Sequence, residues 1–258
     1  MPLLRTRPRT SPRTLPLLAS VAVIGAACAP VRAARAQELQ VLYDWRHSVD
    51  PRNNRRDFPT VTYQTYHGSA NGAFLLKAQG DLDGSRHNMS KVYVEATQTV
   101  KFWKPAVFLH LEYTSGLGLF DRAAGGYYLD NAYLVGAAHP FRWGGAWASA
   151  YVAYRYTNTP RASHDPQLSL YWGRTLGGRW RAWDLASTGV AWTQNRNRGD
   201  AWTAALRGKR AALLVEHGVW YRCGPRAALG ARVIVSENVF AADDRAVVYP
   251  ALGVRRQF

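Results

Sequence analysis

Charged and tyrosine side chains recur at every second residue of several short segments, with apolar residues between them. Lys91, Tyr93 and Glu95 form one such series, and His110 and Glu112 form another. Because side chains of a β-strand point alternately to its two faces, each series lies on one face and the apolar residues lie on the other. One face can therefore form ion pairs or hydrogen-bond a polar solute, while the other is suited to an apolar environment.

The polar face carries acids, bases and tyrosines when all predicted strands are taken together. Basic residues outnumber acidic ones, so a water-filled passage lined by this face would favour anions or neutral polar solutes. The same charges could instead pair with one another and fill the interior, and inward tyrosines are also ordinary filling. The predicted lining residues are Asp44, Tyr66, Lys77, Lys91, Tyr93, Glu95, Lys101, Glu112, Tyr151, Arg155, Tyr171, Asp184, Glu216, Arg232 and Arg255.

Twelve segments show the alternation that predicts a β-strand with two different environments. Most are about ten residues long, the length that a tilted strand needs to cross a membrane. They cover residues 39–45, 58–67, 73–82, 91–102, 107–113, 128–138, 146–156, 167–174, 180–192, 210–222, 226–236 and 247–258.

The connections between these segments alternate in length. Those after odd-numbered strands, such as 46–57 and a Gly-rich loop over 115–126, are mostly longer and polar, whereas the others, such as 68–72, are mostly shorter. Membrane barrels have long extracellular loops and short periplasmic turns. The sequence therefore predicts an all-β fold, a twelve-stranded antiparallel transmembrane β-barrel with both termini in the periplasm.

The final strand has a special place in this prediction, because it must pair with the first strand to leave no free edge. On its inner face we expect Arg255 to pair with Glu38 or Asp44. The chain ends at Phe258. We predict that this terminal aromatic lies at the periplasmic edge and is the signal that the barrel assembly machinery of the outer membrane reads.

The first 36 residues form a different kind of sequence. Arginines precede an apolar run over 15–29, and Ala34, Arg35 and Ala36 form a small-x-small cleavage site. This pattern is typical of a cleaved secretory signal peptide, which leaves residues 37–258 as a single barrel domain in the outer membrane of a Gram-negative bacterium. Whether Cys28 is lipidated stays open.

Composition agrees with an exported barrel. Apolar residues make up 47% of the 258-residue chain, yet the mean hydropathy is -0.28. The 10 Trp and 14 Tyr residues suit two aromatic belts at the membrane surfaces. Six of the 33 basic residues lie in the leader, so the rest carries 27 basic and 17 acidic residues, a net charge of +10. The bases are scattered in an exported chain, which argues against nucleic acid and favours lipopolysaccharide phosphates as partners of the loops.

Enzymatic chemistry has less support. A lipid hydrolase of the barrel type would need Ser, His and an acid. His110 and Glu112 share a face, but no serine stands on their segment, and no Gly-x-Ser-x-Gly motif occurs. No His or Cys cluster has metal-ligand spacing, and there is no Gly-rich phosphate loop. We therefore expect a protein that is not an enzyme and that uses no cofactor or metal.

Six short segments also carry a family resemblance. They are 39–44 (LQVLYD), 95–103 (EATQTVKFW), 110–113 (HLEY), 131–136 (NAYLVG), 230–236 (GARVIVS) and 249–254 (YPALGV). In this order they resemble the Tsx-like family of Gram-negative outer-membrane proteins, in particular its branch of uncharacterised members. The resemblance implies a twelve-stranded barrel. Named members are nucleoside-specific channels, but no motif for nucleosides is matched here.

The expected function is passive diffusion of small polar solutes, nucleosides among them, through a narrow outer-membrane channel. Two alternatives stay open at this point. One is a closed structural or surface-interaction barrel whose interior is filled by its own side chains. The other is a lipid-modifying enzyme.

Overall fold

The computed structural model describes residues 34–86, 88–119, 125–201, 203–239 and 245–258. The predicted signal peptide, including Cys28, lies outside the described residues except for its last three positions. Those positions, 34–36, are the first three residues of the first strand.

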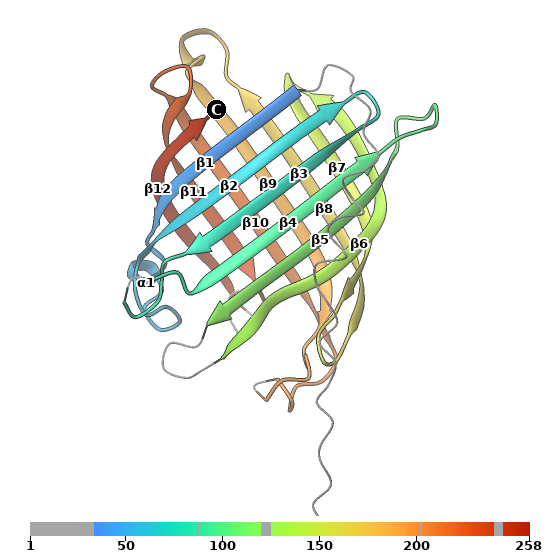
Figure 1. Ribbon diagram of the computed structural model, residues 1–258, viewed down its shortest axis with the longest axis vertical. Coiled ribbons are helices and arrows are strands. Elements are labelled where there is room, and N and C mark those ends of the chain that lie inside the picture. Colours follow the sequence, from blue (N-terminus) through green and yellow to red (C-terminus); the bar gives the residue numbers. More distant parts are fainter. Residues whose placement is uncertain (1–33, 87, 120–124, 202, 240–244) are drawn as a thin grey trace, which may run out of the picture. The chain divides into compact units, whose positions relative to one another are not determined.

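Twelve antiparallel strands form one closed barrel (Figure 1), which confirms the predicted fold class. Each strand is hydrogen-bonded to the strands before and after it in the chain. Their bounds are β1 Ala34–Asp44, β2 Phe58–Ser69, β3 Gly72–Asp81, β4 Lys91–Val100, β5 Phe108–Leu119, β6 Gly126–Trp143, β7 Ala146–Thr157, β8 Ser163–Thr175, β9 Trp183–Asn195, β10 Lys209–Arg222, β11 Ala227–Glu237 and β12 Ala246–Gln257.

The first and last strands close the barrel, as predicted. Their register pairs Glu38 with Gln257 at one end and Asp44 with Ala251 at the other. The backbone N–H of Phe258 continues this pairing by donating to the carbonyl of Gln37 at 3.1 Å. Closure satisfies the backbone hydrogen bonds of both edges, which is the condition for placing strands in a lipid bilayer.

The two faces of the wall differ in the way that the alternation predicts. Outward positions are apolar and exposed, for example Val152 (60%), Leu168 (56%) and Leu229 (55%). Inward positions are mainly polar or small and are buried or half-buried. Twelve strands thus enclose a polar interior behind an apolar outer surface, which is the pattern of a membrane barrel.

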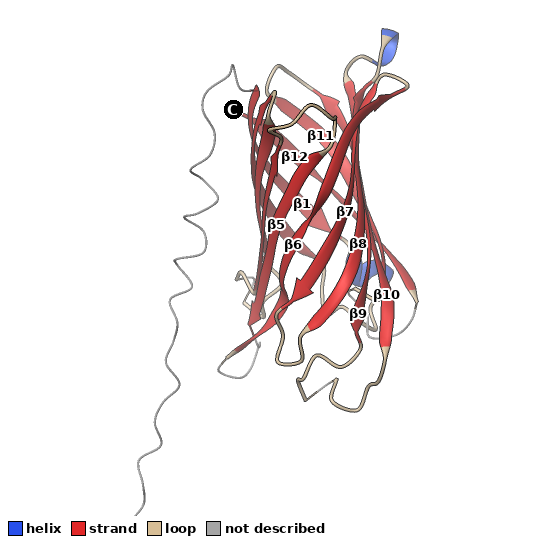
Figure 2. Cartoon of the chain, turned by 90° about the vertical axis from the view of Figure 1, so that its right-hand side faces the viewer, coloured by secondary structure: helices blue, strands red, loops and turns tan. Residues whose placement is uncertain are grey.

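The strands cross the barrel obliquely, and their connections gather at two ends (Figure 2). We call one end the loop end; the described residues of its connections are 45–57, 82–86, 88–90, 125, 158–162, 196–201, 203–208, 238–239 and 245. The other is the turn end, where the connections are 70–71, 101–107, 144–145, 176–182 and 223–226 and where both chain ends of the barrel lie. The short helix α1 (Arg46–Val49) belongs to the loop end, and the 3-10 helix η2 (Gly178–Trp180) belongs to the turn end. In the described part of the chain, no helix is long and apolar enough to cross a membrane.

Exposed aromatic side chains collect near both ends of the wall. Phe141, Trp143 and Trp180 are exposed at the turn end, while Tyr43 and Tyr128 are exposed close to the loop end. This distribution agrees with the two aromatic belts that the Trp and Tyr content predicted.

The Gly-rich loop predicted over 115–126 was wrong for half of its residues, 115–119 and 126, which lie in strands. The chain stays in β5 as far as Leu119 and re-enters a strand at Gly126. Glycine here makes room inside the barrel, because a Cβ at Gly118 would run into the ring of Tyr127. Likewise, the turn predicted over 140–145 shrinks to Gly144 and Gly145, both with positive φ.

The sixth strand had no clear inward face in the sequence, and a bulge explains why. The register of β5 and β6 shifts between Gly116 and Leu117, so the alternation changes phase inside β6. Beyond the bulge, Ala132 and Leu134 are buried with Ala153 of the next strand, and the residues between them point outward.

Candidate functional site

The interior at mid-height is lined by charged and aromatic side chains from opposite walls. Most lie near the centres of their strands, and we call them the middle ring. Its members are Lys77, Glu95, His110, Glu112, Tyr151, Tyr171, Glu216 and Arg232.

An ion pair crosses the interior within the middle ring. Lys77 of β3 donates to Glu216 of β10 at 3.3 Å, although these strands are not neighbours in the barrel. Arg232 of β11 also attracts the carboxylate of Glu216 and donates to Gln79 of β3 at 3.4 Å. The side chains of Lys77 and Glu216 are 19% and 21% exposed, so solvent-accessible space reaches the pair.

Aromatic side chains and two acids make up the opposite side of the middle ring. The ring of His110 lies 4.4 Å from that of Tyr151, which meets Tyr171 edge-on at 5.1 Å. His110 Nε2 and a carboxylate oxygen of Glu112 are 3.0 Å apart, and the hydroxyl of Tyr171 donates to Glu95 at 3.5 Å. This side offers acceptors and ring faces, which suit a polar ring or a hydrogen-bond donor.

The loop end is closed on one side by a compact group that we call the mouth cluster: Asp44, Arg46, Phe58 and Tyr249. Arg46 donates to both oxygens of Asp44, at 3.2 Å from Nε and 2.7 Å from Nη2. Its guanidinium stacks 4.9 Å from the Phe58 ring and 5.0 Å from the Tyr249 ring. Burial alone would lower the pKa of Arg46, but the bonds to Asp44 raise it, so the arginine stays charged.

A second arginine is buried on the other side of the loop end. Nη2 of Arg155 on β7 donates to both oxygens of Asp130, at 2.7 and 2.8 Å, and its Nη1 donates to Gln167 at 2.9 Å. Arg155 also lies 5.3 Å from the ring of Trp192. Hydrogen bonds between two charged groups are among the stronger ones in proteins. The bonds of Arg155 hold β6, β7 and β8 in register with one another.

At the turn end the interior carries a third set of ion pairs. Arg255 of β12 donates to Asp184 of β9 at 2.7 Å and lies 3.6 Å from Glu38 of β1. The prediction that Arg255 pairs with Glu38 or Asp44 is thus correct for Glu38, while Asp44 is taken by Arg46. Arg222 also approaches Asp184, at 3.6 Å.

The predicted lining residues lie at three levels of the barrel: the loop end, the middle ring and the turn end. The middle ring contains seven of them: Lys77, Glu95, Glu112, Tyr151, Tyr171, Glu216 and Arg232. Asp44, Lys91 and Arg155 belong to the loop end, Asp184 and Arg255 to the turn end, and Tyr93 lies between Lys91 and Glu95 on β4. Tyr66 is 41% exposed near the turn end. Lys101 follows the end of β4 and lies 5.3 Å from the ring of Phe108, so it belongs to a connection and not to the barrel wall.

Several residues that shape the interior were not predicted from the sequence. Arg46, Arg55 and Arg56 lie in a connection that looked like an ordinary polar loop, and Asp130 lies beside the bulge of β6. The doublet of arginines at 55 and 56 was the available signal. Among the described residues no group of three or more His, Cys, Asp or Glu is placed to hold a metal ion. Cys223 is a free, exposed thiol.

The family of this chain follows from its sequence profile. The profile of DUF5020, a domain of unknown function, matches residues 36–258. The chain belongs to the DUF5020 family. No curated protein matches the sequence.

Three solved structures that resemble this DUF5020 member are distant from it in sequence. A loop-deletion form of OmpT, an outer membrane protein of Vibrio cholerae, has 9% identity and a TM-score of 0.43, over 88% of this chain and 99% of the other. A porin has 8% identity and a TM-score of 0.40, over 88% and 100%. A bacterial polysaccharide outer membrane secretin has 8% identity and a TM-score of 0.41, over 89% of this chain and 100% of the other.

Proposed function

We propose that this protein is an outer-membrane barrel through which small polar solutes diffuse passively. The observation that carries the proposal is the cross-lumen pair of Lys77 and Glu216, which stays partly exposed at mid-height. A lumen packed solid by its own side chains would bury such a pair. Solutes would replace part of their hydration with hydrogen bonds from the middle ring as they pass.

The outer surface supports the cellular location in this proposal. Its exposed apolar residues, between two zones of exposed aromatics, are what a lipid bilayer requires. The loop end would face the exterior and lipopolysaccharide, and both chain ends of the barrel would lie in the periplasm. Phe258, which is 57% exposed at the turn end, would then stand where the assembly machinery reads its substrates.

The kind of solute follows from the chemistry of the middle ring. Tyrosine rings, carboxylates and a lysine offer both ring faces and hydrogen bonds, which a nucleoside could use, in keeping with the resemblance to Tsx-like channels. The proposal does not include catalysis or a cofactor.

Planar bilayers test the proposal directly. The refolded protein should give discrete conductance steps. The Lys77→Gln/Glu216→Gln double variant, which removes both charges and keeps polar side chains at both positions, should change the step size and the ion selectivity. Lack of any steps at high protein load would reject the channel. A liposome-swelling panel of nucleosides, sugars and amino acids would then identify the solute class.

A closed barrel without transport is the second candidate, and a specific observation favours it. Contacts cross the interior at two levels: the pair of Lys77 and Glu216 lies at mid-height, and the pair of Arg255 and Asp184 lies at the turn end. If these contacts persist on the time scale of permeation, the barrel is a structural or surface-interaction protein. In that case the double variant would open a path that the natural protein lacks.

A further inference from the structure

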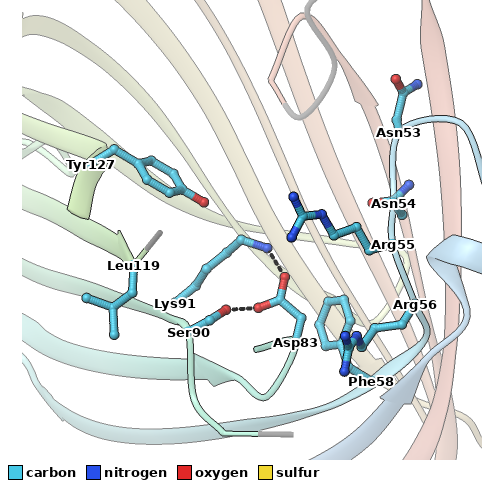
Figure 3. A pocket seen from close by; sticks show the side chains of 10 residues that line it. All are labelled: Asn53, Asn54, Arg55, Arg56, Phe58, Asp83, Ser90, Lys91, Leu119 and Tyr127. Atoms are coloured by element: carbon cyan, nitrogen blue, oxygen red, sulfur yellow. Dashed lines mark hydrogen bonds and ion pairs between the residues drawn. The ribbon is translucent and has the colours of Figure 1, made fainter. Parts of the chain in front are cut away.

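A cavity of about 290 Å³ lies at the loop end, between the connection 45–57 and the beginning of β4 (Figure 3). Its size is close to the lower limit of small-molecule sites. Its walls include Asn53, Arg55, Arg56, Phe58, Asp83, Lys91 and Tyr127. We call it the mouth pocket.

The mouth pocket is basic. Three of its wall residues, Arg55, Arg56 and Lys91, carry a positive charge, against one acid, Asp83. Asp83 is already engaged, because Ser90 Oγ and Lys91 Nζ both donate to its carboxylate. An incoming anion would therefore meet a net positive charge with no uncompensated carboxylate opposing it.

The basic groups are held from different elements and converge on the same space. Arg56 is fixed by donating to the carbonyls of Gly84 and Ser85 at 3.1 and 3.3 Å. Lys91 Nζ lies 5.7 Å from the ring of Phe58. Figure 3 shows the guanidinium of Arg55 pointing toward Lys91, with the hydroxyl of Tyr127 turned to the same space.

The pocket faces the inside of the barrel. Lys91 shares the inner face of β4 with Tyr93 and Glu95, and Phe58 contacts the buried Arg46 in the mouth cluster. An anion in this position would stand on the path of a solute that enters from the loop end. A lipid headgroup would have to leave the outer surface of the barrel to reach it.

We infer that the mouth pocket binds the anionic group, of phosphate type, of a small soluble solute. Arginine forks and a lysine are the usual protein partners of phosphate and carboxylate oxygens. This inference deepens the proposed function by giving the solute an anionic group. The inference rests on the proposed function only for the passage of the bound solute through the barrel. Binding of the anion at the mouth pocket does not require that the barrel conducts.

Phosphate titration of the full-length chain in detergent tests the inference. Calorimetry at low ionic strength should show saturable binding of inorganic phosphate. The Arg55→Gln variant should weaken this binding by about tenfold or more, because it removes a charge-assisted hydrogen bond to the anion. Arg55 is exposed, so its substitution leaves the folded wall intact. Arg52→Gln is the matched control, because Arg52 is exposed in the same connection but outside the pocket.

Each result bears on the inference separately from the channel proposal. Equal phosphate affinity in the natural protein and in Arg55→Gln, or no saturable binding, overturns the inference. Lipopolysaccharide can also be added during the titration. If it abolishes phosphate binding to the natural protein and does not change the residual phosphate binding of Arg55→Gln, the pocket binds a lipid phosphate, and the assignment to a soluble solute is overturned. Phosphate binding without conductance supports the anion-binding pocket and rejects the channel. Conductance without phosphate binding supports the channel and rejects the anion-binding pocket.

Discussion

The mouth cluster and the middle ring both pair opposite charges inside the barrel, but they do so in different ways. In the mouth cluster the partners Asp44 and Arg46 are two residues apart, and their side chains are 1% and 8% exposed. In the middle ring Lys77 and Glu216 come from opposite walls and keep 19% and 21% exposure. The first pair is a local, dry structural contact, and the second depends on closure of the barrel and is reached by solvent.

The difference also concerns the sign of charge along the path. The mouth pocket has three bases and one acid, whereas the middle ring has the acids Glu95, Glu112 and Glu216 against two permanent bases. Lys91 and Glu95 lie on the same face of β4 with Cα atoms about 13 Å apart, from the rise of a strand. A solute with an anionic group and a polar ring could touch both levels in succession. From the sequence alone, charges of both signs were expected on the inner face, with bases outnumbering acids and no order along the path. The structure separates them into a basic mouth and a more acidic middle.

The largest effect is expected for Arg46→Ala in the mouth cluster. It leaves the carboxylate of Asp44 buried beside Phe58 and Tyr249 without its guanidinium, which typically costs about 3–5 kcal/mol. Unfolding in urea from lipid vesicles should show this loss, and Arg52→Ala, an exposed arginine of the same connection, should be neutral. A neutral Arg46→Ala would mean that the mouth cluster does not differ from the middle ring.

A smaller effect is expected for the cross-lumen pair. A double-mutant cycle on Lys77→Gln and Glu216→Gln should give a coupling energy of about 0.5–3 kcal/mol, because the side chains are in contact at 3.3 Å. Single-channel recordings of the same variants should show Lys77→Gln shifting selectivity toward cations and Glu216→Gln shifting it toward anions. A coupling energy near zero would show that the pair does not persist in the membrane.

Tyr171→Phe should have a still smaller effect on stability. The substitution removes the hydrogen bond from Tyr171 to Glu95, which is long at 3.5 Å. A typical hydrogen bond contributes about 0.5–1.5 kcal/mol to stability. The edge-on contact with Tyr151 is preserved. The expected change is in passage: the rate of nucleoside uptake into liposomes should fall while ion conductance stays nearly constant. An equal fall in both would place Tyr171 in the scaffold and not among the solute contacts.

The smallest effect concerns Asp57, at the end of the connection that carries α1. Burial alone would raise the pKa of Asp57, but hydrogen bonds from the side chain and backbone of Ser48 and from the backbone of His47 lower it. A lowered pKa in the folded state stabilises the connection above the ordinary pKa of an aspartate, and this contribution is lost as the pH falls through the lowered value. The protection factors of residues 46–57 against hydrogen exchange should therefore fall slightly below about pH 4, and Asp57→Asn should abolish this dependence.

Much of the fold could be predicted, because each strand has an apolar and a polar face and period-two alternation survives in a single sequence. All twelve predicted segments correspond to strands, and the closing pair was predicted correctly. The errors fall where another constraint overrides alternation. Gly116 and Gly118 looked like loop residues, but they lie in β5. They are glycines because Leu129 and Tyr127 occupy the space that larger side chains would need. The bulge beside them reverses the inward and outward alternation of the side chains of β6. No local sequence pattern predicts this bulge.

For strands without a bulge, the sequence by itself determined which residues can face inward, since alternate residues of a strand point to opposite sides. It also determined that Arg255 has an acid within reach, because the closing pair brings β12 beside Glu38. Only the tertiary structure decided which inward charges meet. Lys77 and Glu216 are 139 residues apart in the chain, and their contact depends on barrel diameter, strand tilt and register together. The connection 45–57 has no alternation at all, so the burial of Arg46 and the position of Arg55 at the mouth pocket follow from packing that is settled only when the barrel is closed.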